Sequence, residues 1–113
     1  MNTSLLLHEQ RCEHRVGAPL SDAEAQPLLA QLAGWSIDAS VRGGVLHRTF
    51  SFHDFHATMA FVNAVAWIAH SQDHHPDLAA SYKRCTLRWN THSVGGLSLN
   101  DFICAARVDA LTL

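Results

Sequence analysis

The sequence predicts an α+β fold in which helices pack on one face of an antiparallel sheet. Apolar residues recur at helical spacing in three segments and alternate at strand spacing in the segments between them. The resulting order is helix, hairpin, helix, one or two strands, helix. There is neither βαβ alternation nor an internal repeat, which argues against a parallel, doubly wound sheet.

The first helix is predicted from its capping residues. Ser21 and Glu24 have the spacing of a capping box, in which the two residues satisfy each other's backbone N–H groups. Pro27 lies late for a proline of the first turn, so we expect either a later start or a kink. Gly34 is a suitable residue to end this helix.

A β-hairpin is expected next, because the hydrophobic period changes from helical spacing to alternation. Residues 35–39 alternate apolar and polar side chains, and residues 45–52 do the same. Gly43 and Gly44 lie between them and are typical of a turn. Two alternating runs joined so closely predict paired antiparallel strands.

Residues 54–72 form the longest segment at helical spacing, and Pro76 cannot continue it, so the chain should turn at about residues 73–75. A broad apolar stripe predicts a helix that packs flat across a sheet. The stripe is formed by Phe55, Met59, Val62, Ala66 and Ala69, widened by Phe61, Val65 and Ile68.

Residues 78–91 predict a strand with one apolar face and one face that carries arginines, as in a sheet with one solvated side. The stretch 77–82 could form a short strand of its own. Ser98 begins the last predicted helix, and Asp101 stands three residues later, where a carboxylate completes the cap.

Composition limits the class of protein. The chain has 113 residues, which suits a single domain at residues 19–113 behind an aperiodic N-terminal arm at residues 1–18. A net charge of −2 with scattered cationic residues argues against nucleic acid as a partner. Three cysteines without CxxC spacing and no apolar run of membrane length favour a cytoplasmic protein that does not contact membranes.

Histidine is unusually abundant, with nine residues. His74 and His75 lie near the predicted end of a helix, where the partial negative charge of the backbone favours imidazolium. His92 stands where a strand gives way to a loop. Each of these residues also has a non-functional interpretation. His74 and His75 could be a solvated pair at the helix end, and His92 a loop histidine bonded to nearby backbone. Asp101 could serve only as a helix cap. We interpret four other histidines as exposed or structural: His47, His53, His56 and His70.

A metal site is the competing interpretation of the same histidines. His70 and His74 have H-x3-H spacing and could bind zinc together with a distant third histidine. The HExxH glutamate is missing, however, and the cysteines fall on apparent core positions. No Gly-rich phosphate loop or nucleophile elbow occurs in the sequence. We therefore predict neither a metal nor an organic cofactor.

Several residues at fixed spacings resemble the signature of the pterin-4a-carbinolamine dehydratase family. They are His70, His74, His75 and Pro76, then Tyr82 six positions on, His92 ten beyond it and Asp101 nine beyond that. Segments 19–21, 34–35, 50–55, 60–63 and 95–102 agree with the same family. The resemblance spans about residues 19–110.

This resemblance implies the order helix-strand-strand-helix-strand-strand-helix, with a four-stranded antiparallel sheet in which 77–82 is a separate strand. It implies a homodimer or homotetramer. It also implies the reaction: dehydration of a 4a-hydroxytetrahydropterin to quinonoid dihydropterin and water, in tetrahydrobiopterin recycling, by histidine acid–base catalysis without a cofactor.

Site roles are carried over from the family residue by residue. His74 and His92 would act as the acid–base pair on opposite sides of the 4a carbon, and His75 would hold the pterin and share the proton work. Asp101 would orient a histidine or cap the helix. The residues implied to line the pterin are Pro76, Asp77, Leu78 and Asp101.

Two positions depart from the family's usual pattern. His70 replaces a residue that is more often acidic, and Leu78 stands where an aromatic side chain is common in animal members. Other relatives serve as dimerisation cofactors of a homeodomain transcription factor or as assembly factors for Rubisco. A non-catalytic scaffold on the same fold is therefore the alternative function.

Overall fold

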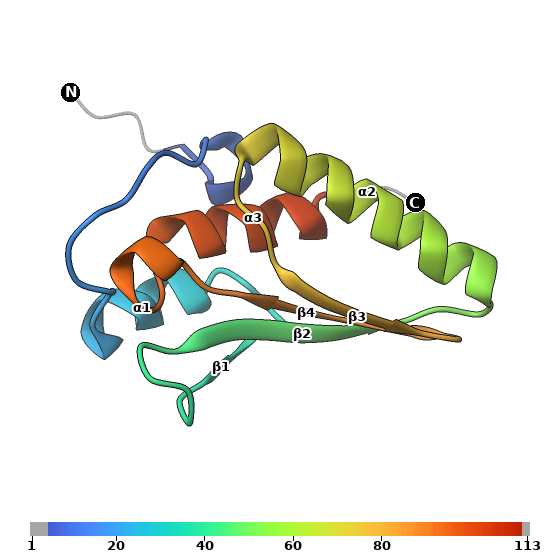
Figure 1. The fold of residues 1–113 in the computed structure, drawn as a ribbon, viewed down its shortest axis with the longest axis horizontal. Helices are drawn as coiled ribbons and strands as arrows, with labels where there is room; N and C mark the ends of the chain where they lie inside the picture. Colours follow the sequence, from blue (N-terminus) through green and yellow to red (C-terminus); the bar gives the residue numbers. More distant parts are fainter. Residues whose placement is uncertain (1–4, 112–113) are drawn as a thin grey trace.

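A computed structural model describes residues 5–111, which form a four-stranded antiparallel sheet with helices on one face (Figure 1). The strand order is β1-β2-β4-β3. This confirms the predicted α+β class and the separate strand before β4. The elements are α1 (Asp22–Leu29), β1 (Ser36–Asp38), β2 (Val45–Ser51), α2 (Phe55–Gln72), β3 (Asp77–Ser81), β4 (Arg84–Trp89) and α3 (Leu99–Asp109), with short 3-10 helices η1 (Leu7–Glu9) and η2 (His92–Val94).

The two faces of the sheet differ as the alternating sequence predicts. Leu46 pairs with Trp89 across β2 and β4, and both side chains are fully buried beneath the helices. On the opposite face, Thr49 and Thr86 are directly paired, and their hydroxyl oxygens lie 2.8 Å apart. Burial of alternate residues therefore fixes the register, since a slip by one residue would expose the apolar set.

α1 confirms the capping box and corrects the predicted end of the helix. The Ser21 hydroxyl accepts from Glu24 N at 3.2 Å, and the Glu24 carboxylate accepts from Ser21 N at 2.8 Å. The helix begins directly after this cap and tolerates Pro27 near its end. Gly34 does not end it, because α1 stops at Leu29. Gly34 instead adopts φ +88, where a Cβ would lie 2.9 Å from the guanidinium of Arg48.

α2 begins at the predicted position, and the residues predicted to widen its apolar stripe, Phe61, Val65 and Ile68, are all buried. The buried face is therefore centred on these residues and not on the principal stripe. Among the principal stripe residues only Ala69 is buried, and Phe55 is 51% exposed. The cause is that α2 is apolar over most of its circumference, so periodicity alone did not single out one face. Trp67 is 68% exposed. The buried residues are Thr58, Phe61, Val65, Ile68, Ala69 and Gln72.

The N-terminal arm packs against the helices over its described part; residues 1–4 lie outside the described residues. Leu7 of η1 belongs to the hydrophobic core and is 5% exposed. Arg107 of α3 donates from its guanidinium to the backbone carbonyl of Gln10. Figure 1 shows the arm crossing the end of the molecule at which α2 finishes and α3 begins.

Candidate active site

The end of α2 places His74 beside α3. Asp73 adopts the left-handed conformation, with φ 50 and ψ 44. His74 N donates to Ala69 O at 3.1 Å and Asp73 N donates to His70 O at 3.2 Å, which is the pattern of a Schellman motif. Because α2 ends at Gln72, His70 and His74 do not share a continuous helical face. The turn directs His74 inward and leaves His70 exposed.

His74 and Asp101 form a hydrogen-bonded pair. His74 Nε2 lies 2.6 Å from Asp101 Oδ1, and their side chains are 11% and 0% exposed. Asp101 is the third residue of α3, and its Oδ2 accepts from the backbone N–H of Ser98 at 2.9 Å. The sequence left open whether this carboxylate orients a histidine or caps the helix. Its two oxygens do both at once.

The polar chain around Asp101 determines which atoms donate. Thr91 Oγ1 donates to Asp101 Oδ2 at 2.9 Å, and the hydroxyls of Thr91 and Ser98 lie 2.7 Å apart. With its proton directed at Asp101, Thr91 accepts from Ser98. Asp101 Oδ2 therefore accepts two hydrogen bonds, as a carboxylate does. An ionised Asp101 has no proton to donate from Oδ1, so the Nε2 of His74 is the donor between them, and Nδ1 is the ring nitrogen left for proton exchange.

Trp89 restrains the imidazole from one side. Its ring stacks on that of His74, with centroids 5.7 Å apart and planes at 18°. The indole is fully buried at the end of β4, and its N–H has no hydrogen-bond partner among the described residues. Packing, rather than a hydrogen bond of its own, therefore holds Trp89 in place. The stack and the Asp101 bond together leave His74 little rotational freedom.

A cavity of about 280 Å³ opens beside His74. Its walls come from the arm, the end of α2 and the start of α3, so segments distant in sequence meet there. Most of the lining groups are polar, which suits a ligand with hydrogen-bonding edges. The lining residues are Cys12, Glu13, His14, Arg15, Gln72, Asp73, His74, Thr91, Ser93 and Asn100.

The other predicted site residues have exposed or half-buried positions. His75 follows His74 directly, yet its side chain is exposed, and His92 is exposed at the start of η2. Pro76 is half-buried, while Asp77 and Leu78 open the exposed edge strand β3. Among the described residues, a hydrogen bond joins His74 to Asp101, whereas no hydrogen bond, ion pair or ring stack joins His74 to His92. The roles inferred for His75 and His92 remain predictions.

Several lining residues were not singled out by sequence reasoning. Gln72 is buried at the end of α2, and its side-chain oxygen accepts from Cys12 N at 2.8 Å. Asn100 is buried in the first turn of α3; its side-chain oxygen accepts from Glu13 N at 3.2 Å, and its amide donates to Glu13 O at 2.7 Å. The arm lacks a hydrophobic period, so the sequence carried no signal that it reaches this site.

Asn100→Ala should release the arm from the site. The change removes the hydrogen bonds from Glu13 N and Arg15 Nε to the Asn100 oxygen, together with the bond from its amide to Glu13 O. At roughly 0.5–1.5 kcal/mol for each bond, we expect the free energy of unfolding to fall by about 2 kcal/mol. Urea denaturation measures the loss, and amide exchange at Glu13 should accelerate. Unchanged exchange there would show that other contacts hold the arm.

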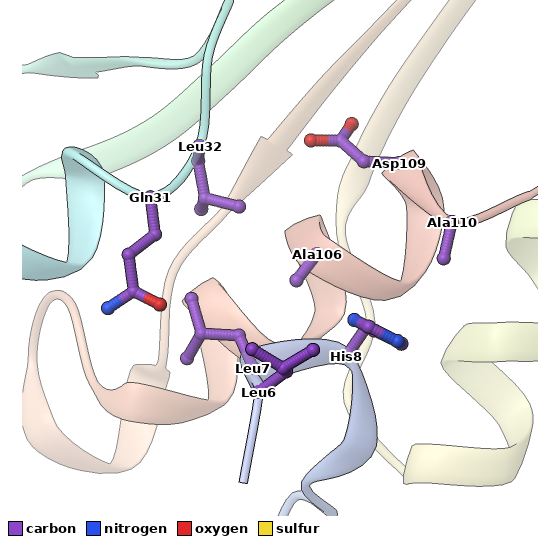
Figure 2. A pocket seen from close by; sticks show the side chains of 8 residues that line it. All are labelled: Leu6, Leu7, His8, Gln31, Leu32, Ala106, Asp109 and Ala110. Carbon is purple, nitrogen blue, oxygen red and sulfur yellow. The ribbon is translucent and has the colours of Figure 1, made fainter. Parts of the chain in front are cut away.

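A second cavity, of about 330 Å³, lies beside η1 and the last turns of α3 (Figure 2). Its lining comes from η1 and the residue before it, the segment after α1 and the last turns of α3. The Asp109 carboxylate at its rim already accepts from Trp35 Nε1 at 3.0 Å and from Arg48 at 3.2 Å. None of the predicted site residues lines this cavity, so we place the candidate site at His74.

Two properties of residues 5–111 bear on other functional classes. No cluster of three or more His, Cys, Asp or Glu side chains in this range has the arrangement of a metal site. His74 Nε2 is hydrogen-bonded to Asp101 and is therefore not free to act as a zinc ligand. Within the same range, no helix combines the length and apolar character needed to cross a bilayer.

The fold and the site together define a small α+β protein in which a histidine–carboxylate pair borders a polar cavity. The family model described as Pterin 4 alpha carbinolamine dehydratase matches residues 18–111. A relative from Stenotrophomonas maltophilia (strain K279a), named "Putative pterin-4-alpha-carbinolamine dehydratase", is 55% identical over 108 residues, covering 94% of this chain and 91% of the relative. The chain therefore belongs to the pterin 4 alpha carbinolamine dehydratase family.

Further relatives agree in sequence or fold. A protein of Nitrosospira multiformis with the same name is 48% identical over 107 residues, covering 93% of this chain and 91% of its own. A crystal structure of a transcriptional coactivator/pterin dehydratase from Brucella melitensis has a TM-score of 0.76 at 29% identity, covering 81% of this chain and 96% of that one. A pterin dehydratase-like protein described as a RuBisCO assembly factor in the alpha-carboxysome shares the fold, with a TM-score of 0.59 at 22% identity and coverage of 68% and 87%.

Proposed function

We propose that this protein dehydrates a 4a-hydroxytetrahydropterin to quinonoid dihydropterin and water by histidine acid–base catalysis, as a cytoplasmic step of tetrahydrobiopterin recycling. Family membership supports the substrate class. The observation that carries the chemistry is the 2.6 Å contact between His74 Nε2 and the buried Asp101 carboxylate, at the wall of a cavity.

The reaction requires one proton to be delivered and another removed. The C4a–O bond breaks as the hydroxyl receives a proton and leaves as water. Loss of the N5 proton leaves its electron pair to form the C4a=N5 double bond, so atoms and charge balance. Imidazole groups perform both transfers near neutral pH, and each positioned group contributes roughly 10²–10⁴-fold.

We assign the base to His74 and the acid to His92. The neutral His74 ring donates from Nε2 to Asp101, so its Nδ1 lone pair would accept the N5 proton. The negative charge of Asp101 and the C-terminal end of α2 both stabilise the imidazolium that forms. His75 would hold the pterin and share the proton work. The residues proposed to bind the pterin edge are Pro76, Asp77 and Leu78.

A turnover assay with chemically generated carbinolamine tests the function directly. We expect the protein to accelerate formation of the quinonoid product, followed by its absorbance, far above the uncatalysed rate. Dialysis against a chelator should leave this rate unchanged, because the proposed proton transfers use side chains only. A loss of activity restored by zinc would favour the metal interpretation.

A non-catalytic scaffold remains the competing function. Its support is the fold shared with the carboxysomal assembly factor and with the transcriptional coactivator/pterin dehydratase of Brucella melitensis. If the protein failed to accelerate dehydration and instead retained a large partner in a pull-down, the scaffold function would replace the catalytic one. Retention of His74 and Asp101 as a buried, oriented pair favours catalysis, since a scaffold has no need of an oriented imidazole.

We also propose that the protein is a homodimer or homotetramer. Trp67 and Phe55 project from α2 with 68% and 51% of their surface exposed, and all five residues of the edge strand β3 are exposed. Aromatic side chains and unpaired strand edges are typical of surfaces between subunits. A monomeric mass in sedimentation equilibrium at micromolar concentration would contradict this proposal.

A further inference from the structure

Two thiols from distant parts of the chain meet beside the candidate site. Cys12 Sγ on the arm lies 3.5 Å from Cys104 Sγ on α3, although 92 residues separate them. Neither is bonded to another cysteine in the structure. A disulfide requires sulfur atoms about 2.05 Å apart, so the pair must close by about 1.5 Å. Cys12 lies on an arm without regular secondary structure at that point, which can supply such a movement.

We propose that Cys12 and Cys104 form an oxidation-sensitive pair in which peroxide attacks Cys12 and Cys104 resolves the product as a disulfide. This modification site is independent of the catalytic activity proposed above. It would join the arm covalently to α3, next to the His74–Asp101 pair.

The two thiols differ in exposure and in pKa, as this chemistry requires. Cys12 is partly exposed and lines the cavity, whereas Cys104 is fully buried. The hydrogen bond from Cys104 lowers the pKa of the Cys12 thiol, and the positive charge of Arg107 acts in the same direction against its partial burial. The hydrogen bond with Cys12, together with burial, raises the pKa of Cys104. Cys12 is therefore the nucleophile.

The reaction balances with peroxide as the only co-reactant. The Cys12 thiolate attacks one peroxide oxygen, the O–O bond breaks and hydroxide leaves, giving a sulfenic acid at Cys12. This hydroxide takes up the proton that Cys12 lost and becomes water. The Cys104 sulfur then displaces the sulfenic hydroxyl, which leaves with the Cys104 proton as a second water. The two sulfur atoms give up two electrons in total, and peroxide accepts both.

Cys85 provides the matched control. It is fully buried in β4, and burial raises the pKa of its thiol, yet it pairs with no other cysteine. Any general oxidation of buried thiols would include it, whereas oxidation at the proposed site would not. Cys85→Ala should therefore form the same cross-link as the original sequence.

The experiment treats the reduced full-length protein with hydrogen peroxide and measures its mass and peptide map without reductant. We expect each chain to lose two hydrogen atoms, with the peptides of Cys12 and Cys104 joined and Cys85 free, and dithiothreitol should reverse the change. In Cys104→Ala, dimedone should label Cys12 as a trapped sulfenic acid. Retention of three free thiols, a cross-link between chains or one that includes Cys85 would overturn the proposal.

Thermal unfolding gives a second measurement. Closing a loop of 92 residues restricts the unfolded chain, so oxidation should raise Tm by roughly 5–15 °C. Cys12→Ser changes a partly exposed arm residue and should leave the fold intact while abolishing this rise. A cross-linked protein with a lower Tm than its reduced form would show that the disulfide distorts the docked arm. That result would contradict a stabilising link between the arm and α3.

Discussion

Asp101→Asn should lower kcat for carbinolamine dehydration by roughly 10²–10⁴-fold while the fold is retained. Thr91 and Ser98 N both donate to the same carboxylate oxygen, so the asparagine carbonyl must occupy that position. The asparagine NH₂ group then faces His74 Nε2 and donates to it. The histidine is forced into the opposite tautomer, with a proton on Nδ1, and can no longer accept the N5 proton.

The tautomer of His74 can be measured independently of the dehydratase activity. Nitrogen NMR of the His74 ring should show a proton on Nε2 in the original protein and on Nδ1 in Asp101→Asn. Asp109→Asn serves as the control, because Asp109 lies at the far end of the same helix and bonds Trp35 and Arg48 instead. Undiminished turnover in Asp101→Asn would show that the carboxylate only caps α3.

Asp101 also illustrates what the sequence could and could not predict about the site. Its spacing from Ser98 identified a helix cap, because capping depends on residues three positions apart. The second oxygen bonds His74, which lies 27 residues away. Such a contact depends on how α2 and α3 pack together. Local spacing contains no information about that packing, so only the family resemblance pointed to a second role.

The residue types alone do not distinguish His74 from His75, because they are neighbours at a predicted turn; only the family resemblance gives them different roles. The structure separates them through Asp73, whose left-handed conformation turns the chain so that one imidazole enters the site and the other faces solvent. Asp tolerates this conformation better than most residues, but many aspartates at helix ends do not adopt it. The orientations of the His74 and His75 side chains therefore could not be predicted from residue types.

The strands were predicted more accurately than the face of α2. In β4, buried and partly exposed residues alternate, and this period marks the side that faces the core. In α2, Phe55 and Trp67 are apolar but exposed, so hydrophobicity marks the core and an outer surface alike. For a helix that also carries an apolar outer surface, periodicity therefore predicts the length correctly but misplaces the centre of the buried face.

His74→Ala and His92→Ala should each lower the rate of dehydration more than tenfold, because each removes one of the two proton-transfer groups. His74→Gln sharpens the first case. Its side-chain NH₂ can still donate to Asp101, so the buried carboxylate keeps a partner, but an amide does not exchange protons near neutral pH. We expect His74→Gln to be as slow as His74→Ala and more stable to urea, which would separate proton transfer from structural support.

His53→Ala is the matched control for removal of a histidine. His53 is exposed beside Asp54 at the start of α2, and its Nε2 lies 3.1 Å from that carboxylate. The 18 residues of α2 extend over about 27 Å, which separates this position from His74. Its replacement should leave the rate almost unchanged. Equal losses at positions 53, 74 and 92 would mean that the activity depends on general stability, and the acid–base assignment would then be wrong.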